Sequence, residues 1–157
     1  MKITKTITSM EIDSTDLKIL DILRQRGRET FTAIAEQVDL TGPSVLARVR
    51  RMEEDGIIRG YTAVLDHTHI GQGLVAFIRV TTAATPARTG ENAFEAFVHS
   101  APQVLECYSV DGEDSYLLKT RTGSPLELQA LLTRLRAIRT VSRTVTTIAL
   151  DTIKEWR

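Results

Sequence analysis

Apolar residues recur with the period of an α-helix in the first third of the chain. Residues 14–25 carry leucine and isoleucine at helical spacing, and Gly27 follows as a stop signal. Asp13 precedes this segment as a candidate N-cap, and Asp16 stands three residues later, where an acidic side chain can bond back to the cap. The pattern therefore predicts a first helix over residues 14–25.

Two more helical segments follow at close spacing. Thr30 is a candidate cap for a helix that ends near Asp39, and Thr41 is a candidate cap for a helix that ends at Gly56. The apolar positions of the later helix are Val45, Val49 and Met52. Only a few residues separate the two segments, so these brief helices must cross steeply, as in a helix-turn-helix.

The other face of this third predicted helix carries small and basic side chains. Ser44 and Ala47 would let the helix approach base edges closely, and Arg48 lies one turn beyond Ser44, where it could read a guanine edge. Residues 41–52 contain no acid, although the whole chain has 20 basic and 20 acidic side chains. A solvated basic face on a small bundle is the alternative. We expect a DNA contact surface made of Thr41, Ser44, Ala47, Arg48, Arg50 and Arg51.

The second half alternates between strand and helix patterns. Strands are predicted over residues 74–82, 104–110, 115–121 and 141–150, and helices over residues 91–100 and after Ser124. The order β-α-β-β-α-β is that of a ferredoxin-like domain. The predicted fold class is therefore α+β, with a three-helix, winged-helix-like helix-turn-helix domain before a ferredoxin-like βαββαβ domain. The predicted boundaries are 11–60 for the first domain, 61–73 for a linking strand and joint, and 74–152 for the second domain.

One face of the predicted sheet lacks a cover within its own domain. A four-stranded sheet with both helices on one side exposes its other side. Outward positions of the first strand, such as Val75 and Phe77, are apolar. We expect two copies of the chain to pack these faces together; coverage by the linking segment is the alternative.

Composition narrows the class of protein. The chain has 157 residues, of which 42% are hydrophobic and 25% charged, as is usual for globular domains. Cys107 is the one cysteine, so an internal disulfide is impossible and a cytoplasmic location is expected. No apolar run approaches the roughly 18 residues of a membrane span, so we expect no membrane partner.

The sequence resembles the leucine-responsive regulatory protein and asparagine-regulator (Lrp/AsnC) family of transcription factors. The resemblance rests on residues 12–20 (IDSTDLKIL), 48–63 (RVRRMEEDGIIRGYTA) and 102–107 (PQVLEC), and it covers about residues 11–155. It implies an N-terminal helix-turn-helix that binds double-stranded DNA and a C-terminal domain that senses a small effector, usually an amino acid. It also implies homodimers, commonly assembled into octamers.

The effector site is expected at the turn before the third strand. Gly112 would let the backbone approach a ligand, Asp114 could pair with an ammonium group, and the Ser115 hydroxyl could add a hydrogen bond. Thr144 and Thr146 alternate along the last strand and could line the same cleft. An ordinary hairpin turn with solvated acids is the alternative. Ser115 stands where the family often has an acid, and residues 138–141 depart from its common Leu-Pro-Gly-Val, so the ligand's identity stays open.

Other chemistry has little support in the sequence. His67 and His69 lack a clustered third ligand, so neither a metal nor a cofactor is expected. No paired carboxylates and no nucleophile–base set point to catalysis, so we do not expect an enzyme. Two alternatives to an effector-responsive regulator stay open: an architectural DNA-binding protein that senses nothing, and an enzyme or regulatory subunit built on the second domain.

Overall fold

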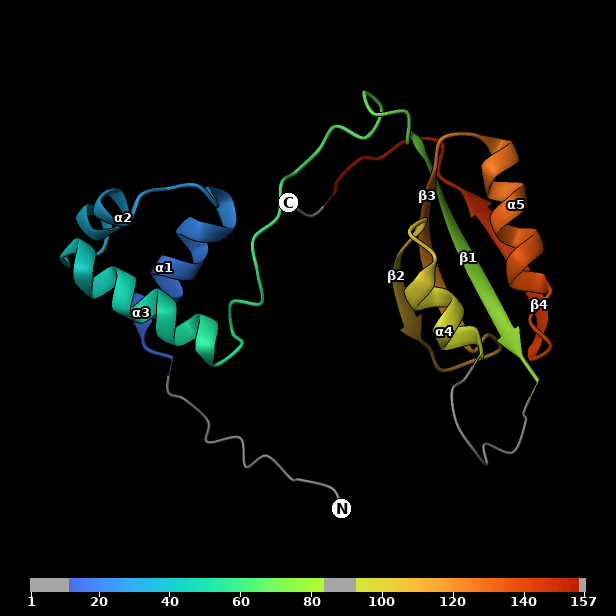
Figure 1. Cartoon of the computed structure of the whole chain (residues 1–157), viewed down its shortest axis with the longest axis horizontal. Coiled ribbons are helices and arrows are strands. Elements are labelled where there is room, and N and C mark those ends of the chain that lie inside the picture. Colours follow the sequence, from blue (N-terminus) through green and yellow to red (C-terminus); the bar gives the residue numbers. More distant parts are fainter. Residues whose placement is uncertain (1–11, 84–92, 156–157) are drawn as a thin grey trace, which may run out of the picture. The chain divides into compact units, whose positions relative to one another are not determined.

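The computed structural model describes residues 12–83 and 93–155. The chain divides into two compact units, the first reaching to Val64 and the second spanning Leu65–Glu155. Figure 1 shows that the first unit is helical and that the second combines a sheet with two helices. The α+β class and the two architectures predicted from the sequence are confirmed.

Three helices form the first unit: α1 (Ser14–Gln25), α2 (Phe31–Gln37) and α3 (Gly42–Glu54). Each begins at a residue predicted as its cap, because the side chains of Asp13, Thr30 and Thr41 accept backbone N–H groups of the first turn. Asp13 and Asp16 complete a capping box at α1. The helix boundaries predicted from the sequence are therefore confirmed to within two residues.

The core of this unit joins all three helices. Ile19 of α1, Ile34 of α2 and Val45 of α3 are fully buried, and Val49 and Met52 extend the same cluster along α3. Asp39 has a φ of 55° in the joint between α2 and α3. This left-handed residue reverses the chain within a few positions, which produces the steep crossing of a helix-turn-helix.

The segment predicted as a linking strand is not one. Residues 59–66 form no helix or strand, and residues 67–71 form a turn. β-forming side chains alone do not make a strand, because a strand needs the hydrogen-bonding edge of a neighbour. The structure pairs no edge with this segment.

The second unit has the predicted element order. Its strands are β1 (Leu74–Thr82), β2 (Val104–Ser109), β3 (Tyr116–Thr122) and β4 (Val141–Ile148), and its helices are α4 (Ala93–Ser100) and α5 (Pro125–Arg136). The strands form one antiparallel sheet in the order β2-β3-β1-β4, so β2 and β4 are its edges. Most of the loop predicted after β1, and the first two residues predicted for the following helix, lie outside the described residues.

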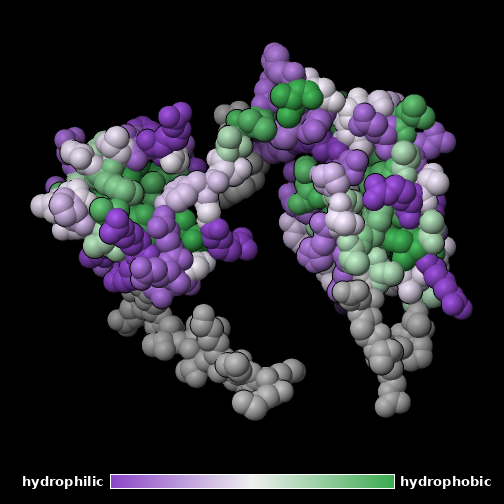
Figure 2. Space-filling view, viewed as in Figure 1, coloured by the Kyte–Doolittle hydropathy of each residue, from purple (hydrophilic) through white to green (hydrophobic). Residues whose placement is uncertain are grey.

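The two faces of this sheet differ. Ala76, Ile78 and Val80 of β1 are fully buried against Phe94 of α4 and the leucines of α5, so both helices cover the same face. The alternate residues of β1 lie on the other face, called here the open face. Phe77 is 39% exposed at its centre, and Tyr108 of β2 is 53% exposed. Figure 2 shows polar side chains over much of each unit's visible surface, with apolar patches between them.

No helix in the described part of the chain is both long and apolar enough to cross a membrane.

Candidate functional site

Helix α3 presents a polar surface opposite its buried face. Val45, Val49 and Met52 turn inward, and Ser44 and Ala47 are among the exposed residues of the helix. The Ser44 and Thr41 hydroxyls are hydrogen-bonded to each other at 2.9 Å in the first turn. The side chains at the start of the helix are therefore short and held in place.

The helical pattern predicted that Arg48 points outward into solvent, but the structure shows that it does not. Its side chain is only 28% exposed, and its Nη1 donates to Asp13 Oδ2 at 2.6 Å and to Asp16 Oδ1 at 2.8 Å. Arg48 therefore joins α3 to the first turn of α1. The inward/outward pattern of a single helix missed this contact, because Arg48 lies at the border between the two faces, where a neighbouring helix decides its environment.

Asp16 is the centre of this ion cluster, which consists of Asp13, Asp16, Arg48 and Arg51. Its side chain is fully buried, and its second oxygen accepts from Arg51 Nη2 at 2.7 Å. The backbone N–H of Asp16 and the Arg48 guanidinium hold the pKa of Asp13 below its ordinary value. A buried carboxylate is costly unless it is paired and hydrogen-bonded, so the contacts with Arg48 and Arg51 offset the cost of burying the Asp16 side chain.

The remaining arginine on this surface has a different environment. Arg50 is exposed, and it has no ion pair with any described acid. Arg51 is 46% exposed although it contacts Asp16, so part of its guanidinium stays accessible. The sequence prediction placed Arg48, Arg50 and Arg51 on one surface. In the structure Arg48 and Arg51 also form ion pairs that connect α3 to α1, whereas Arg50 forms none with a described residue.

The turn predicted to bind an effector lies at one end of β1. Gly112 has a φ of 127°, a conformation that L side chains rarely adopt. Asp114 accepts from the Thr81 hydroxyl at 3.2 Å and lies 3.3 Å from Arg79 Nη1. The Ser115 hydroxyl accepts the backbone N–H of Thr82 at 3.1 Å. Both side chains are thus already bonded to β1.

Thr144 and Thr146 do not share a cleft with Asp114 within one chain. They pair with Val80 and Ile78, so they lie on the helix-covered face, whereas Asp114 contacts residues of the open face. Thr144 Oγ1 accepts from Arg136 Nε at 2.8 Å. The buried Thr146 hydroxyl has no hydrogen-bond partner among the described residues. Their alternation was predicted correctly, but the face on which they lie depends on strand register, which the sequence does not reveal.

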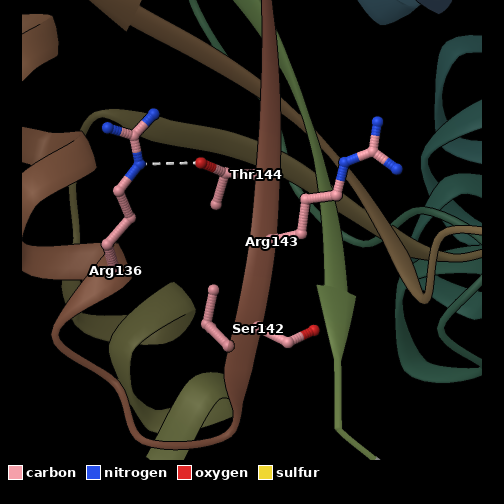
Figure 3. A pocket seen from close by; sticks show the side chains of 5 residues that line it. Arg136, Ser142, Arg143 and Thr144 are labelled. Atoms are coloured by element: carbon pink, nitrogen blue, oxygen red, sulfur yellow. Dashed lines mark hydrogen bonds between the residues drawn. The ribbon is translucent and has the colours of Figure 1, made fainter.

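A shallow hollow of about 270 Å³ lies beside β4. Its lining residues are Arg136, Val141, Ser142, Arg143 and Thr144. Figure 3 shows Arg136 and Arg143 on opposite sides of the strand, with the hydrogen bond from Arg136 to Thr144 between α5 and β4. In the described part of the chain no cluster of three or more His, Cys, Asp or Glu side chains could hold a metal ion.

Two family models match the chain, one on each unit. Residues 12–59 match winged helix-turn-helix DNA-binding domains, and residues 75–157 match the Lrp/AsnC ligand binding domain.

Relatives of known function match over most of their length. A proline dehydrogenase transcriptional activator of Rhodobacter capsulatus is 35% identical, over 92% of this chain and 94% of the relative. The HTH-type transcriptional regulator LrpA of Mycobacterium tuberculosis is also 35% identical, over 90% and 91%.

Solved structures have the same fold. A transcriptional regulator of Neisseria meningitidis, crystallised as a complex with L-methionine, has a TM-score of 0.82 at 33% identity and covers 93% of this chain and 94% of its own. A feast or famine regulatory protein of M. tuberculosis, complexed with L-methionine, has a TM-score of 0.84 at 34% identity, covering 94% and 97%.

We expect Asp16→Ala to destabilise the first unit by about 3 kcal/mol, because it removes the shared partner of two arginines and leaves both without their buried contact. Asp21→Ala is the matched control: it removes an exposed acid of the same helix, whose pair with Arg24 should contribute less than about 1 kcal/mol. Denaturant unfolding followed by circular dichroism measures both. Equal destabilisation in the two variants would show that the ion cluster does not stabilise the fold.

Proposed function

Because the chain belongs to the Lrp/AsnC family of transcription regulators, we propose that it binds double-stranded DNA through α3 and that an amino acid bound by the second unit modulates this binding. The observation that carries the first part is the exposed face of α3, which is free of acid from residue 41 to residue 52. A regulator that acts on DNA in this way would work in the cytoplasm and need no catalytic group.

The residues of the proposed DNA contact surface have different roles. Thr41, Ser44 and Ala47 form the small end of the helix that approaches base edges. Arg50 and Arg51 supply positive charge for phosphates. Arg48 belongs to the same surface, but its ion pairs with α1 give it a positioning role beside any base contact.

Replacing Arg50 by alanine tests this surface with least disturbance to the fold, because Arg50 has no ion pair with a described acid. Arg50→Ala should weaken binding to specific and unrelated DNA alike, and the slope of log K against log salt should fall by about 1, as expected when one phosphate is no longer neutralised. Fluorescence anisotropy on a duplex selected by the wild-type chain from a random pool measures this. Lys18→Ala, an exposed cation of α1, is the control. Unchanged affinity and slope in Arg50→Ala would refute the surface.

For the effector we propose the turn of Gly112, Asp114 and Ser115. Asp114 is a carboxylate that could exchange Arg79 for the ammonium group of an amino acid, since the Arg79 side chain is 51% exposed. The support from relatives is that two homologous structures carry L-methionine. Thr144 and Thr146 lie on the opposite face of the sheet from Asp114. Threonines at these positions could contact such a ligand only if they belonged to another copy of the chain.

A thermal-shift screen over the common amino acids tests the effector proposal. At least one should raise the melting temperature, because a ligand at 100 times its Kd stabilises the folded state by about 2.7 kcal/mol. Asp114→Asn should abolish that shift, and Asp111→Asn, which changes an exposed acid of the same turn, should preserve it. If no amino acid shifts the melting temperature, or if Asp114→Asn responds like the wild type, the proposed site is wrong.

We also propose that the chain forms a homodimer through the open face, with octamers as the larger assembly. Phe77 is a large apolar side chain at the centre of this face, and 39% of it stays exposed. A partly exposed apolar patch rimmed by charge is typical of a protein–protein interface.

Placing a charge at the centre of the open face should separate the copies. Phe77→Arg should shift the sedimentation coefficient at micromolar concentration toward that of a monomer, because the new charge would be desolvated in the interface. Leu126→Arg is the control, since Leu126 is 75% exposed on α5, away from the open face. A Phe77→Arg chain that sediments like the wild type would place the interface elsewhere.

A further inference from the structure

The end of the second unit contains a long stretch without acids. From Leu128 to Leu150 the sequence has no aspartate or glutamate, and it contains Arg134, Arg136, Arg139 and Arg143. The chain as a whole has equal numbers of acidic and basic side chains, so this segment is a local concentration of positive charge. It is as free of acids as residues 41–52 and is longer.

Three of these arginines gather where α5 gives way to β4. Arg136 lies in the last turn of α5, Arg139 in the connection, and Arg143 on the edge strand β4. All three side chains are exposed. They define what we call the β4-edge surface. Arg134 is set apart from it, because its guanidinium lies 5.2 Å from the centre of the Phe97 ring on α4.

The β4-edge surface differs from the other basic residues of the sheet. Arg79, Lys119 and Arg121 each lie within 4 Å of a carboxylate, from Asp114, Glu106 or Glu155. None of the three β4-edge arginines has such a partner among residues 12–83 and 93–155. Asp114, which contacts the strand next to β4, is itself paired with Arg79. The other cations of the sheet are thus paired with carboxylates, whereas the three β4-edge arginines have no carboxylate partner among the described residues.

Local structure explains only part of this pattern. A cation in the last turn of a helix stabilises the negative end of the helix dipole, which accounts for Arg134 and Arg136. Arg136 also donates to Thr144, as Figure 3 shows. Arg139 and Arg143 lie beyond the helix, and neither side chain has a hydrogen bond or ion pair to a described residue that would give it a structural role. The hollow between Arg136 and Arg143 adds the hydroxyls of Ser142 and Thr144 and no acid.

We propose that the β4-edge surface is a second DNA contact, which binds the phosphodiester backbone outside the segment held by α3. This inference rests on the proposed function, which brings DNA to the chain. Exposed arginines spread over a helix end, a connection and an edge strand suit a polyanion that is bound by several separate charge contacts. A small anionic ligand would instead need an enclosing pocket.

The experiment compares short and long duplexes with the full-length chain. Labelled duplexes of about 20 and about 80 base pairs, of equal base composition, are titrated at several salt concentrations. The variant is Arg136→Gln/Arg139→Gln/Arg143→Gln. It should keep wild-type affinity for the short duplex and bind the long duplex about tenfold more weakly, with the salt slope on the long duplex reduced by about 0.9 for each phosphate that the removed arginines neutralised.

Single variants provide the matched control. Arg139→Gln should lower affinity for the long duplex only, and Lys154→Gln, which removes an exposed cation of the same unit outside the surface, should change neither duplex. Sedimentation of every variant checks that assembly is unchanged, since Arg143 lies at the margin of the open face.

The outcomes separate this inference from the proposed function. A wild-type chain that binds neither duplex refutes both. A wild-type chain that binds DNA, with a triple variant equal to it on both duplexes, overturns the second contact alone. A triple variant weakened equally on both duplexes also overturns it, because the arginines would then act through the fold or through α3.

Discussion

The burial of one carboxylate constrains the whole first unit. Asp16 has no exposed surface, so its charge must be satisfied inside the protein. The cap of α1 supplies one contact, and Arg48 and Arg51, three residues apart and therefore on one side of α3, supply the others. These contacts favour one rotation of α3 relative to α1. The same rotation sets which side chains of α3 are exposed, and those side chains form the proposed DNA contact surface.

The zero net charge of the chain conceals two kinds of arginine. One kind is bonded to acids and holds structure together, as Arg48 does in the first unit and Arg121 does beside Glu155 in the second. The other kind, such as Arg50 and Arg139, is exposed and forms no ion pair with a described residue. Only the second kind offers its full charge to a polyanion, because an arginine already paired must give up its partner first. Charge counts along the sequence cannot separate the two.

Helices and strands were predictable here because caps and periodicity are local. Asp13, Thr30 and Thr41 are adjacent to the backbone groups they satisfy, so sequence order reveals their role. Sites were less predictable, since they depend on which elements meet. The ion pairs of Arg48 could be predicted only with the position of α1 known. The location of Asp114 and Thr144 on opposite faces could be predicted only with the register of β4 on β1 known, because a shift of one residue would move Thr144 to the other face.

The same register links the proposed effector site to the proposed dimer interface. Arg79, the partner of Asp114, lies two residues from Phe77 on the same strand and therefore on the same face. If an ammonium group takes the carboxylate of Asp114, Arg79 loses its counter-charge on the surface where copies would meet. An unpaired cation favours a hydrated surface over a buried one. A ligand could thus favour one assembly over another without moving the backbone, by the difference in its affinity for the two states.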